Sequence, residues 1–225
     1  MKKILLSNFF LFCIAICVCF GYFIGRDIER DFLNLYVGKM TLLPFRYVFL
    51  CLIILISNLI FNLFSNSVII VRNKTYFNSF MNMIKYEVFY FILIYVLLNI
   101  PIFIINSKCF FNNLNSILLI ILNSTLISIL ISSIIKLIDI KFKNRVFSSC
   151  LFLITFSIVD LLLDHFNFYI FINNIFDLSY IFVLPILYNN YIIIAILLFL
   201  AICMITSLTI NFSFKKDYFL RNENK

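Results

Sequence analysis

Long apolar stretches, separated by short polar and mostly basic segments, make up almost the whole chain. A helix needs about 20 predominantly apolar residues to cross a bilayer, and six of the stretches approach or exceed that length. The pattern therefore predicts an all-α, polytopic membrane protein, with a single transmembrane domain over residues 1–225. The predicted spans lie at about residues 4–24, 45–71, 88–105, 116–135, 146–163 and 191–210.

The polar segment after the second predicted span favours a short amphipathic helix at Thr75–Tyr86, on the cytoplasmic face. Its apolar residues recur at intervals of three and four, which places them on one stripe of a helix. Such a stripe either lies on lipid headgroups as a linker or docks into a groove on a soluble partner. The residues of the stripe are Tyr76, Phe77, Phe80, Met81 and Ile84.

Two predicted spans carry a polar face. The residues concerned are Asn58, Asn62 and Ser65 in the second span, and Ser124, Ser128 and Ser132 in the fourth. Amide side chains are costly against lipid, so the first face should point into a helix bundle or a pathway. Small hydroxyl residues four apart usually mark close helix packing, and a face that lines a substrate pathway is the alternative.

The first apolar block follows Lys2 and Lys3, as the core of a signal peptide would. It is longer than a usual signal core and no small-x-small cleavage site follows it, so we expect an uncleaved first span. Gly21 and Gly25 form a GxxxG spacing near its end, which allows close helix approach, although a frayed helix end explains it equally well. In the third span, Pro101 should kink or loosen the last turn.

One cluster resembles a chemical site: Asp160, Asp164 and His165, at the outer end of the fifth span. A metal or proton site is one interpretation, and a hydrated helix end is the simpler one. The next segment, Phe168–Leu187, is apolar and aromatic but is interrupted by Asn, Asp and Pro. Short helices on the outer face fit it better than a seventh span, which would place the basic tail outside.

The composition agrees with a membrane protein, because 64% of the residues are hydrophobic and only 12% are charged. Average proteins are roughly 45–50% apolar and about 25% charged. The net charge of +8 does not indicate a nucleic-acid partner, since most of the 18 Lys and Arg residues lie in short segments at span ends. Those segments place both termini in the cytoplasm. The basic residues left for the outer segments and span edges are Arg26, Arg30, Lys39, Arg46 and Lys108.

The seven cysteines indicate neither a disulfide framework nor a zinc site. Only Cys109 lies in a predicted loop, and a thiol inside a span behaves as a small hydrophobe. We expect no metal and no cofactor. An intramembrane protease is disfavoured, because it needs a pair such as Ser/His or Asp/Asp within the spans and this chain has one histidine at a span edge. The cysteines inside predicted spans are Cys13, Cys17, Cys19, Cys51, Cys150 and Cys203.

The order of these parts resembles the membrane subunit of a type-2 ABC exporter, most closely the small permeases of peptide-antibiotic export and self-immunity. That family has six spans with cytoplasmic termini, a coupling helix between the second and third spans, and short outer helices between the fifth and sixth. Val71–Phe80, with Arg72 and Lys74, looks like the basic start of the coupling helix. Family members often begin with an amphipathic elbow helix, whereas only Met1–Leu5 precedes the apolar run here.

The resemblance implies a permease subunit in a bacterial plasma membrane, exporting an apolar or amphipathic peptide or a lipid-like substrate. The chain is not expected to be an enzyme, because it has no G-x-x-x-x-G-K-[ST] loop for ATP. A separate ABC ATPase subunit would bind the cytoplasmic face around Tyr76–Ile84. A second membrane subunit, identical or related, would complete the pathway among the membrane lipids.

Two other functions stay open. The substrate-binding membrane subunit of a vitamin importer also has about six spans and an ATPase-bearing partner complex. Asp160, Asp164 and His165 would serve as its ligand groups, but this function gives no reason for a basic amphipathic helix. A membrane immunity or assembly protein without transport is the other, and failure to stimulate any ATPase would favour it.

Overall fold

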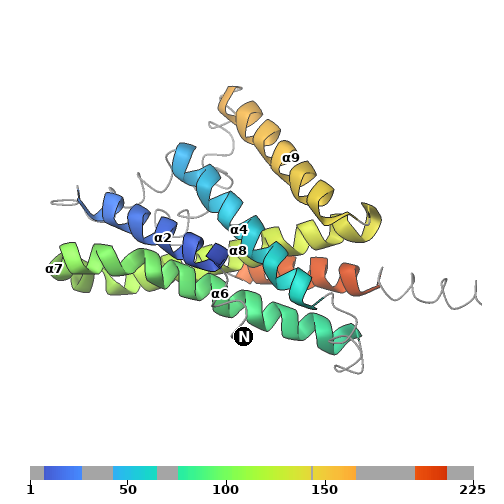
Figure 1. The fold of residues 1–225 in the computed structure, drawn as a ribbon, viewed down its shortest axis with the longest axis horizontal. Coiled ribbons are helices and arrows are strands. Elements are labelled where there is room, and N and C mark those ends of the chain that lie inside the picture. The colour runs from blue at the N-terminus through green and yellow to red at the C-terminus, as the bar shows by residue number, and fades with distance from the viewer. Residues whose placement is uncertain (1–7, 27–42, 65–75, 143, 166–195, 212–225) are drawn as a thin grey trace, which may run out of the picture.

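All regular structure in the described part of the chain is helical. The computed structural model describes residues 8–26, 43–64, 76–142, 144–165 and 196–211. Over these residues the all-α prediction is confirmed, while the outer-face helices predicted at Phe168–Leu187 lie outside them. The helices are α2 (Asn8–Arg26), α4 (Leu43–Phe64), α6 (Tyr76–Ile105), α7 (Ser107–Asn112), α8 (Leu114–Phe142), α9 (Arg145–His165) and an unlabelled helix, Ile196–Asn211 (Figure 1).

The helices run long because the sequence contains few residues that end them. The whole chain has three glycines and three prolines. Pro44 is the second residue of α4, where its missing N–H would have had no partner in the helix. Pro101 lies inside α6, and the helix continues past it to Ile105. The loosening that we predict at Pro101 therefore does not end the helix.

Helix α6 contacts α2, α4 and α8. It forms an antiparallel hairpin with α8, and α7 lies at the turn between them. α9 packs against α8. We call the end of the bundle at α7 the turn end. We call the other end, where α6 begins and α8 passes into α9 at Phe142–Arg145, the junction end.

Helix α2 lies close against α6 through four small residues on one face. Cys13, Cys17, Gly21 and Gly25 follow each other at intervals of four, and all are buried. A Cβ atom on Gly21 would collide with the carbonyl oxygen of Leu98 on α6, so the two backbones are in contact there. The GxxxG spacing thus marks close packing and not a frayed helix end.

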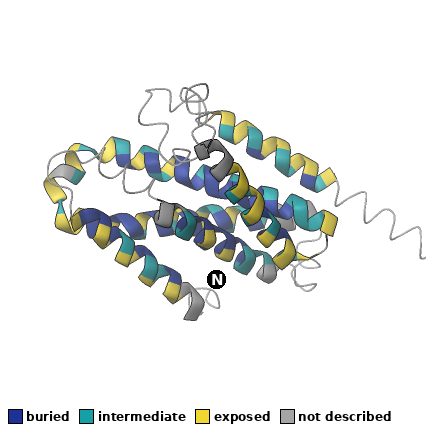
Figure 2. Cartoon of the chain, turned by 90° about the horizontal axis from the view of Figure 1, so that it is seen from above, coloured by how far each residue is buried: buried dark blue, intermediate teal, exposed yellow. Residues whose placement is uncertain are grey.

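Many large apolar side chains are exposed on the described helices, and several polar and charged side chains are buried between them. Figure 2 shows how buried and exposed positions alternate along the helices. From Phe89 to Ile105 every exposed residue of α6 is apolar. By length and composition, two helical stretches could cross a membrane: Met81–Ile105 and Leu114–Phe142. The other apolar helical stretches in the described residues are shorter, at Leu11–Arg26, Tyr47–Phe61, Arg145–Val159 and Ile196–Asn211.

Three predicted segments differ from the structure. The predicted loop around Cys109 is mostly helical, because α7 forms over Ser107–Asn112. The predicted amphipathic helix at Thr75–Tyr86 is not separate, because α6 runs without interruption from Tyr76 through the predicted third span. Nothing between Tyr86 and Val88 breaks a helix, since neither glycine nor proline occurs there. The predicted loop at Lys136–Arg145 is likewise mostly helical, because α8 extends to Phe142 and α9 begins at Arg145.

Candidate functional site: a buried ionic network at the junction end

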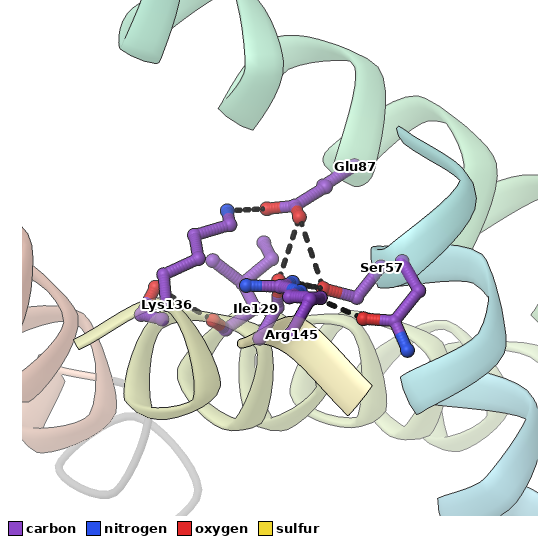
Figure 3. Close-up of polar contacts among 8 residues, drawn as sticks. Ser57, Glu87, Ile129, Lys136 and Arg145 are labelled. Carbon is purple, nitrogen blue, oxygen red and sulfur yellow. Dashed lines mark hydrogen bonds and ion pairs between the residues drawn. The ribbon is translucent and has the colours of Figure 1, made fainter. Parts of the chain in front are cut away.

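Glu87 and Lys136 form an ion pair inside the bundle (Figure 3). Nζ of Lys136 lies 2.5 Å from Oε2 of Glu87, and the side chains expose 3% and 0% of their surface. They meet because α6 and α8 are antiparallel, and Glu87 lies near the beginning of one helix and Lys136 near the end of the other. A buried charge is costly unless it is paired and hydrogen-bonded, so each residue depends on the other.

Two buried serines complete the hydrogen bonding of the Glu87 carboxylate. Ser132 Oγ, on α8, donates to Oε1 over 2.6 Å, and Ser57 Oγ, on α4, lies 3.5 Å from the same oxygen. The two hydroxyl oxygens are 2.6 Å apart. A single carboxylate on α6 thereby joins α4 and α8.

Arg145, the first residue of α9, brings in a fourth helix. Its Nη2 donates to Ser57 Oγ over 2.9 Å, and its Nε donates to Asn58 Oδ1 over 2.7 Å. Asn58 Nδ2 donates in turn to Ser149 Oγ on α9 over 3.1 Å. The guanidinium also lies 4.4 Å from the centroid of the Phe61 ring. A planar fork with several donors makes these contacts together, which a lysine at this position would not reproduce.

The charges of the network are close to balance. Lys136 and Arg145 carry the positive charges, and Glu87 forms the ion pair with Lys136. Asp139, on α8, is a second carboxylate that interacts electrostatically with Arg145. Paired acids and bases are the arrangement in which ionised groups persist away from water.

A line of polar side chains continues from the network along the α6–α8 interface toward the turn end. Tyr95 Oη lies 2.9 Å from Ser128 Oγ, which donates to the carbonyl oxygen of Ser124 over 2.7 Å. Asn99, one turn farther along α6, donates to the carbonyl oxygen of Tyr95 over 2.7 Å. We call Tyr95, Asn99, Asn123, Ser124 and Ser128 the polar seam.

The network fixes the relative positions of four helices. Glu87 holds α6 to α4 and α8, and Arg145 holds α9 to α4. A shift of any one of these helices must break at least one charged hydrogen bond, so the network responds to movement at the junction end. Among the described side chains, no group of three or more His, Cys, Asp or Glu residues is placed to hold a metal ion.

The residues predicted to form polar faces lie at the centre of the bundle where they are described. Ser124, Ser128 and Ser132 are fully buried, and the last two bond to residues of α6. Asn58 is partly buried and faces α9 through its contacts with Arg145 and Ser149. The side chain of Asn62 and all of Ser65 lie outside the described residues.

The stripe predicted to contact a partner lies at the beginning of α6, at the junction end. Met81 is exposed and Ile84 is half-buried. Tyr76, Phe77 and Phe80 belong to the same helix, but their side chains are not described, and Arg72 and Lys74 precede the described residues of α6. The outer cluster of Asp160, Asp164 and His165 lies in the last turns of α9, and these side chains are also outside the described set.

Reasoning from the sequence missed Ser57, Glu87, Lys136 and Arg145 as members of one site. A signal was present, because Glu87 and Lys136 are nearly equidistant in sequence from the turn that joins the predicted third and fourth spans. In an antiparallel hairpin, such positions lie side by side. Opposite charges at matched depths of neighbouring spans thus predict an ion pair.

Comparison of the chain with protein-family models, with curated proteins and with solved structures gives no match.

Proposed function

We propose that the chain is a polytopic membrane protein and the membrane subunit of an ATP-driven exporter. The observation that carries the membrane assignment is the inverted polarity of the bundle, with an apolar exposed face on α6 and charged side chains inside. Water-soluble proteins keep Lys and Glu at the surface, whereas ionisable residues within a membrane face the bundle interior and pair there.

The distribution of basic residues supports a cytoplasmic location for the junction end. Cytoplasmic segments of membrane proteins carry an excess of Lys and Arg. In the described residues the junction end has the larger share. Its basic residues are Lys85, Lys136, Lys141 and Arg145, while the turn end has Arg26, Arg46 and Lys108.

The continuity of α6 supports a direct mechanical link between an ATPase and the bundle. The exposed Met81 and the buried Glu87 lie on the same uninterrupted helix, less than two turns apart. An ATPase that binds the beginning of α6 and moves it also displaces the Glu87 carboxylate. Because this carboxylate bonds to Ser57 and Lys136, the displacement passes to α4 and α8.

The exporter works by opening the bundle to alternate sides of the membrane. Two such subunits, identical or related, enclose the pathway, and a pair of ATPases binds their cytoplasmic ends. ATP binding draws the ATPases together and rocks the two membrane subunits, and hydrolysis resets them. Outside the ionic network, the buried residues of α6 and α8 are uncharged, which favours an apolar or amphipathic cargo that the rocking motion releases outward.

The test of this function is recovery of an ATPase with variants of the tagged chain. The substitution Met81→Asp puts a charge on the exposed start of α6. Alone or combined with Phe80→Asp, it should reduce the amount of co-purified Walker-type ATPase at least tenfold. Phe111→Asp is the matched control, because Phe111 is 62% exposed but lies in α7 at the turn end. It should recover as much ATPase as the unaltered chain. The measurement is quantitative mass spectrometry of pull-downs in mild detergent.

Equal ATPase recovery with Met81→Asp and Phe111→Asp would contradict docking at the start of α6. Amounts of each variant in the membrane fraction must match, so that a loss of ATPase reports binding and not insertion.

A further inference from the structure

In the part of the chain that the structure describes, four buried polar atoms of the polar seam have no hydrogen-bond partner. They are both side-chain amide atoms of Asn123, Oδ1 of Asn99 and Oγ of Ser124. Asn123 and Ser124 are completely buried, and Asn99 is 4% exposed. All three lie on the turn-end side of the Tyr95–Ser128 hydrogen bond, which pairs the neighbouring groups.

These atoms do not stabilise the structure as it stands. Buried polar groups are almost always hydrogen-bonded, and one that is not loses its bonds to water without replacement. Neighbouring groups of the seam differ in this respect. The hydroxyl groups of Tyr95 and Ser128 are hydrogen-bonded to each other, whereas the side-chain amide of Asn123 has no hydrogen-bond partner among the described residues. Violations of this kind are expected where a residue serves a function at the expense of stability.

The chemistry of the unpaired groups defines what would satisfy them. A carboxamide offers one acceptor oxygen and two N–H donors and carries no charge, so its natural complement is another amide group. Buried apolar residues lie within one turn of each amide on its own helix: Ile120 and Ile127 near Asn123 on α8, and Leu98 and Ile102 near Asn99 on α6. The charged groups of the network lie at the other end of the seam.

We propose that Asn99, Asn123 and Ser124 form a binding site for the backbone amide groups of an apolar peptide. The proposal rests on the proposed function as an exporter, and it specifies the cargo as a peptide in place of a lipid without N–H groups. The structure represents the closed site. Separation of α6 from α8 at the turn end exposes the three side chains, and a peptide amide then pairs with them.

The first test compares the thermal stability of purified full-length variants in detergent, without ligand. Asn123→Leu replaces an unpaired amide by an apolar side chain of similar size, so the temperature midpoint of unfolding should stay the same or rise. If both unpaired amide atoms destabilise the folded state, the rise should be about 3 °C or more. Ser128→Ala is the control, because it removes a hydroxyl that bonds to Tyr95, and its midpoint should fall.

The second test uses a defined probe, N-acetyl-leucyl-leucinamide, with methyl laurate as an apolar ester that has no N–H group. The dipeptide amide should raise the midpoint of the unaltered chain in a saturable manner, and methyl laurate should not. Asn123→Leu and Asn99→Leu should each weaken binding of the dipeptide amide at least tenfold.

Three results would overturn the site. They are a midpoint for Asn123→Leu that falls as far as that of Ser128→Ala, no saturable shift of the unaltered chain with the dipeptide amide, and equal binding by the unaltered chain and Asn123→Leu. Both tests use the chain without an ATPase, so they fail or succeed independently of ATPase recovery in the pull-down.

Discussion

Glu87 is the residue on which the packing of the junction end depends. It lies in a fully buried position and receives hydrogen bonds from Lys136 and Ser132, with Ser57 beside it. In a low-dielectric interior neither the carboxylate nor the ammonium group is tolerated alone. The effects of substituting Glu87 and Lys136 on the free energy of unfolding should therefore be strongly coupled.

Loss of one partner of the ion pair should be far more damaging than loss of both. Glu87→Gln leaves the Lys136 ammonium buried without a counter-charge, and should lower the free energy of unfolding by about 3–5 kcal/mol. Lys136→Met leaves the Glu87 carboxylate buried without a counter-charge and should lower the free energy of unfolding by a similar amount. The double variant has no buried charge at this position, so it should recover most of the loss. Thermal unfolding in detergent measures all three midpoints.

Lys85→Met is the control for that series, because Lys85 is an exposed residue of the same helix and its removal should change stability by less than about 0.5 kcal/mol. If the effects of Glu87→Gln and Lys136→Met simply added in the double variant, the two groups would not be coupled.

At this scale the sequence predicts some roles and not others. The spacing of Ser124, Ser128 and Ser132 places them on one face, and they are buried together. The role of Lys136 is different, because a lysine at the end of an apolar run is ordinarily a topology signal. Its burial depends on Glu87 reaching the same depth on another helix, which is a tertiary property.

Among the elements, the α2–α6 pair shows how a short sequence motif fixes a helix contact. Gly21 meets the backbone of α6 at Leu98, whereas a Cβ atom on Gly25 would first meet Cδ1 of Ile105, at 3.0 Å, and would lie 3.3 Å from the Cα atom of Ile102. Backbone atoms cannot move aside without displacing the whole helix, but the tip of an isoleucine side chain can. The two glycines are therefore not equivalent.

Gly21→Ala should destabilise the chain more than Gly25→Ala. The first substitution forces α2 away from α6 and should reduce the free energy of unfolding by about 1–3 kcal/mol or more, as overpacking does. The second should cost less, because Ile105 can change rotamer. Val18→Ala, at an exposed position of α2, is the control. Thermal unfolding checks the order, and equal losses at both glycines would contradict the geometry of the contact.

Most of the described helices were predictable from the sequence, but α7 was predicted as a loop, and several helix ends differ from the prediction. Apolar runs identify α2, α4, α8 and α9, because such runs are long and contain few helix-breaking residues. The boundary between an amphipathic segment and a span is different in kind. It is defined by polarity and not by backbone geometry, so α6 passes through it without interruption.

For the whole molecule, polarity patterning is the property that the sequence predicts best. The long apolar blocks anticipate the apolar exterior, and the basic segments anticipate the larger share of Lys and Arg at the junction end. The polar interior is much harder to predict, because it arises where side chains from α4, α6, α8 and α9 meet. No single segment contains that information.

The most direct test of the account is the co-purification of an ATPase with the unaltered chain. The tagged protein would be extracted from its native membranes in mild detergent, and the co-purifying chains would be identified and their rate of ATP hydrolysis measured. We expect a Walker-type ATPase in near-stoichiometric amount, with hydrolysis that is lost in Met81→Asp. A chain that purifies alone, in a detergent that keeps known ABC transporters intact, would contradict it and would favour a membrane immunity or assembly protein without transport.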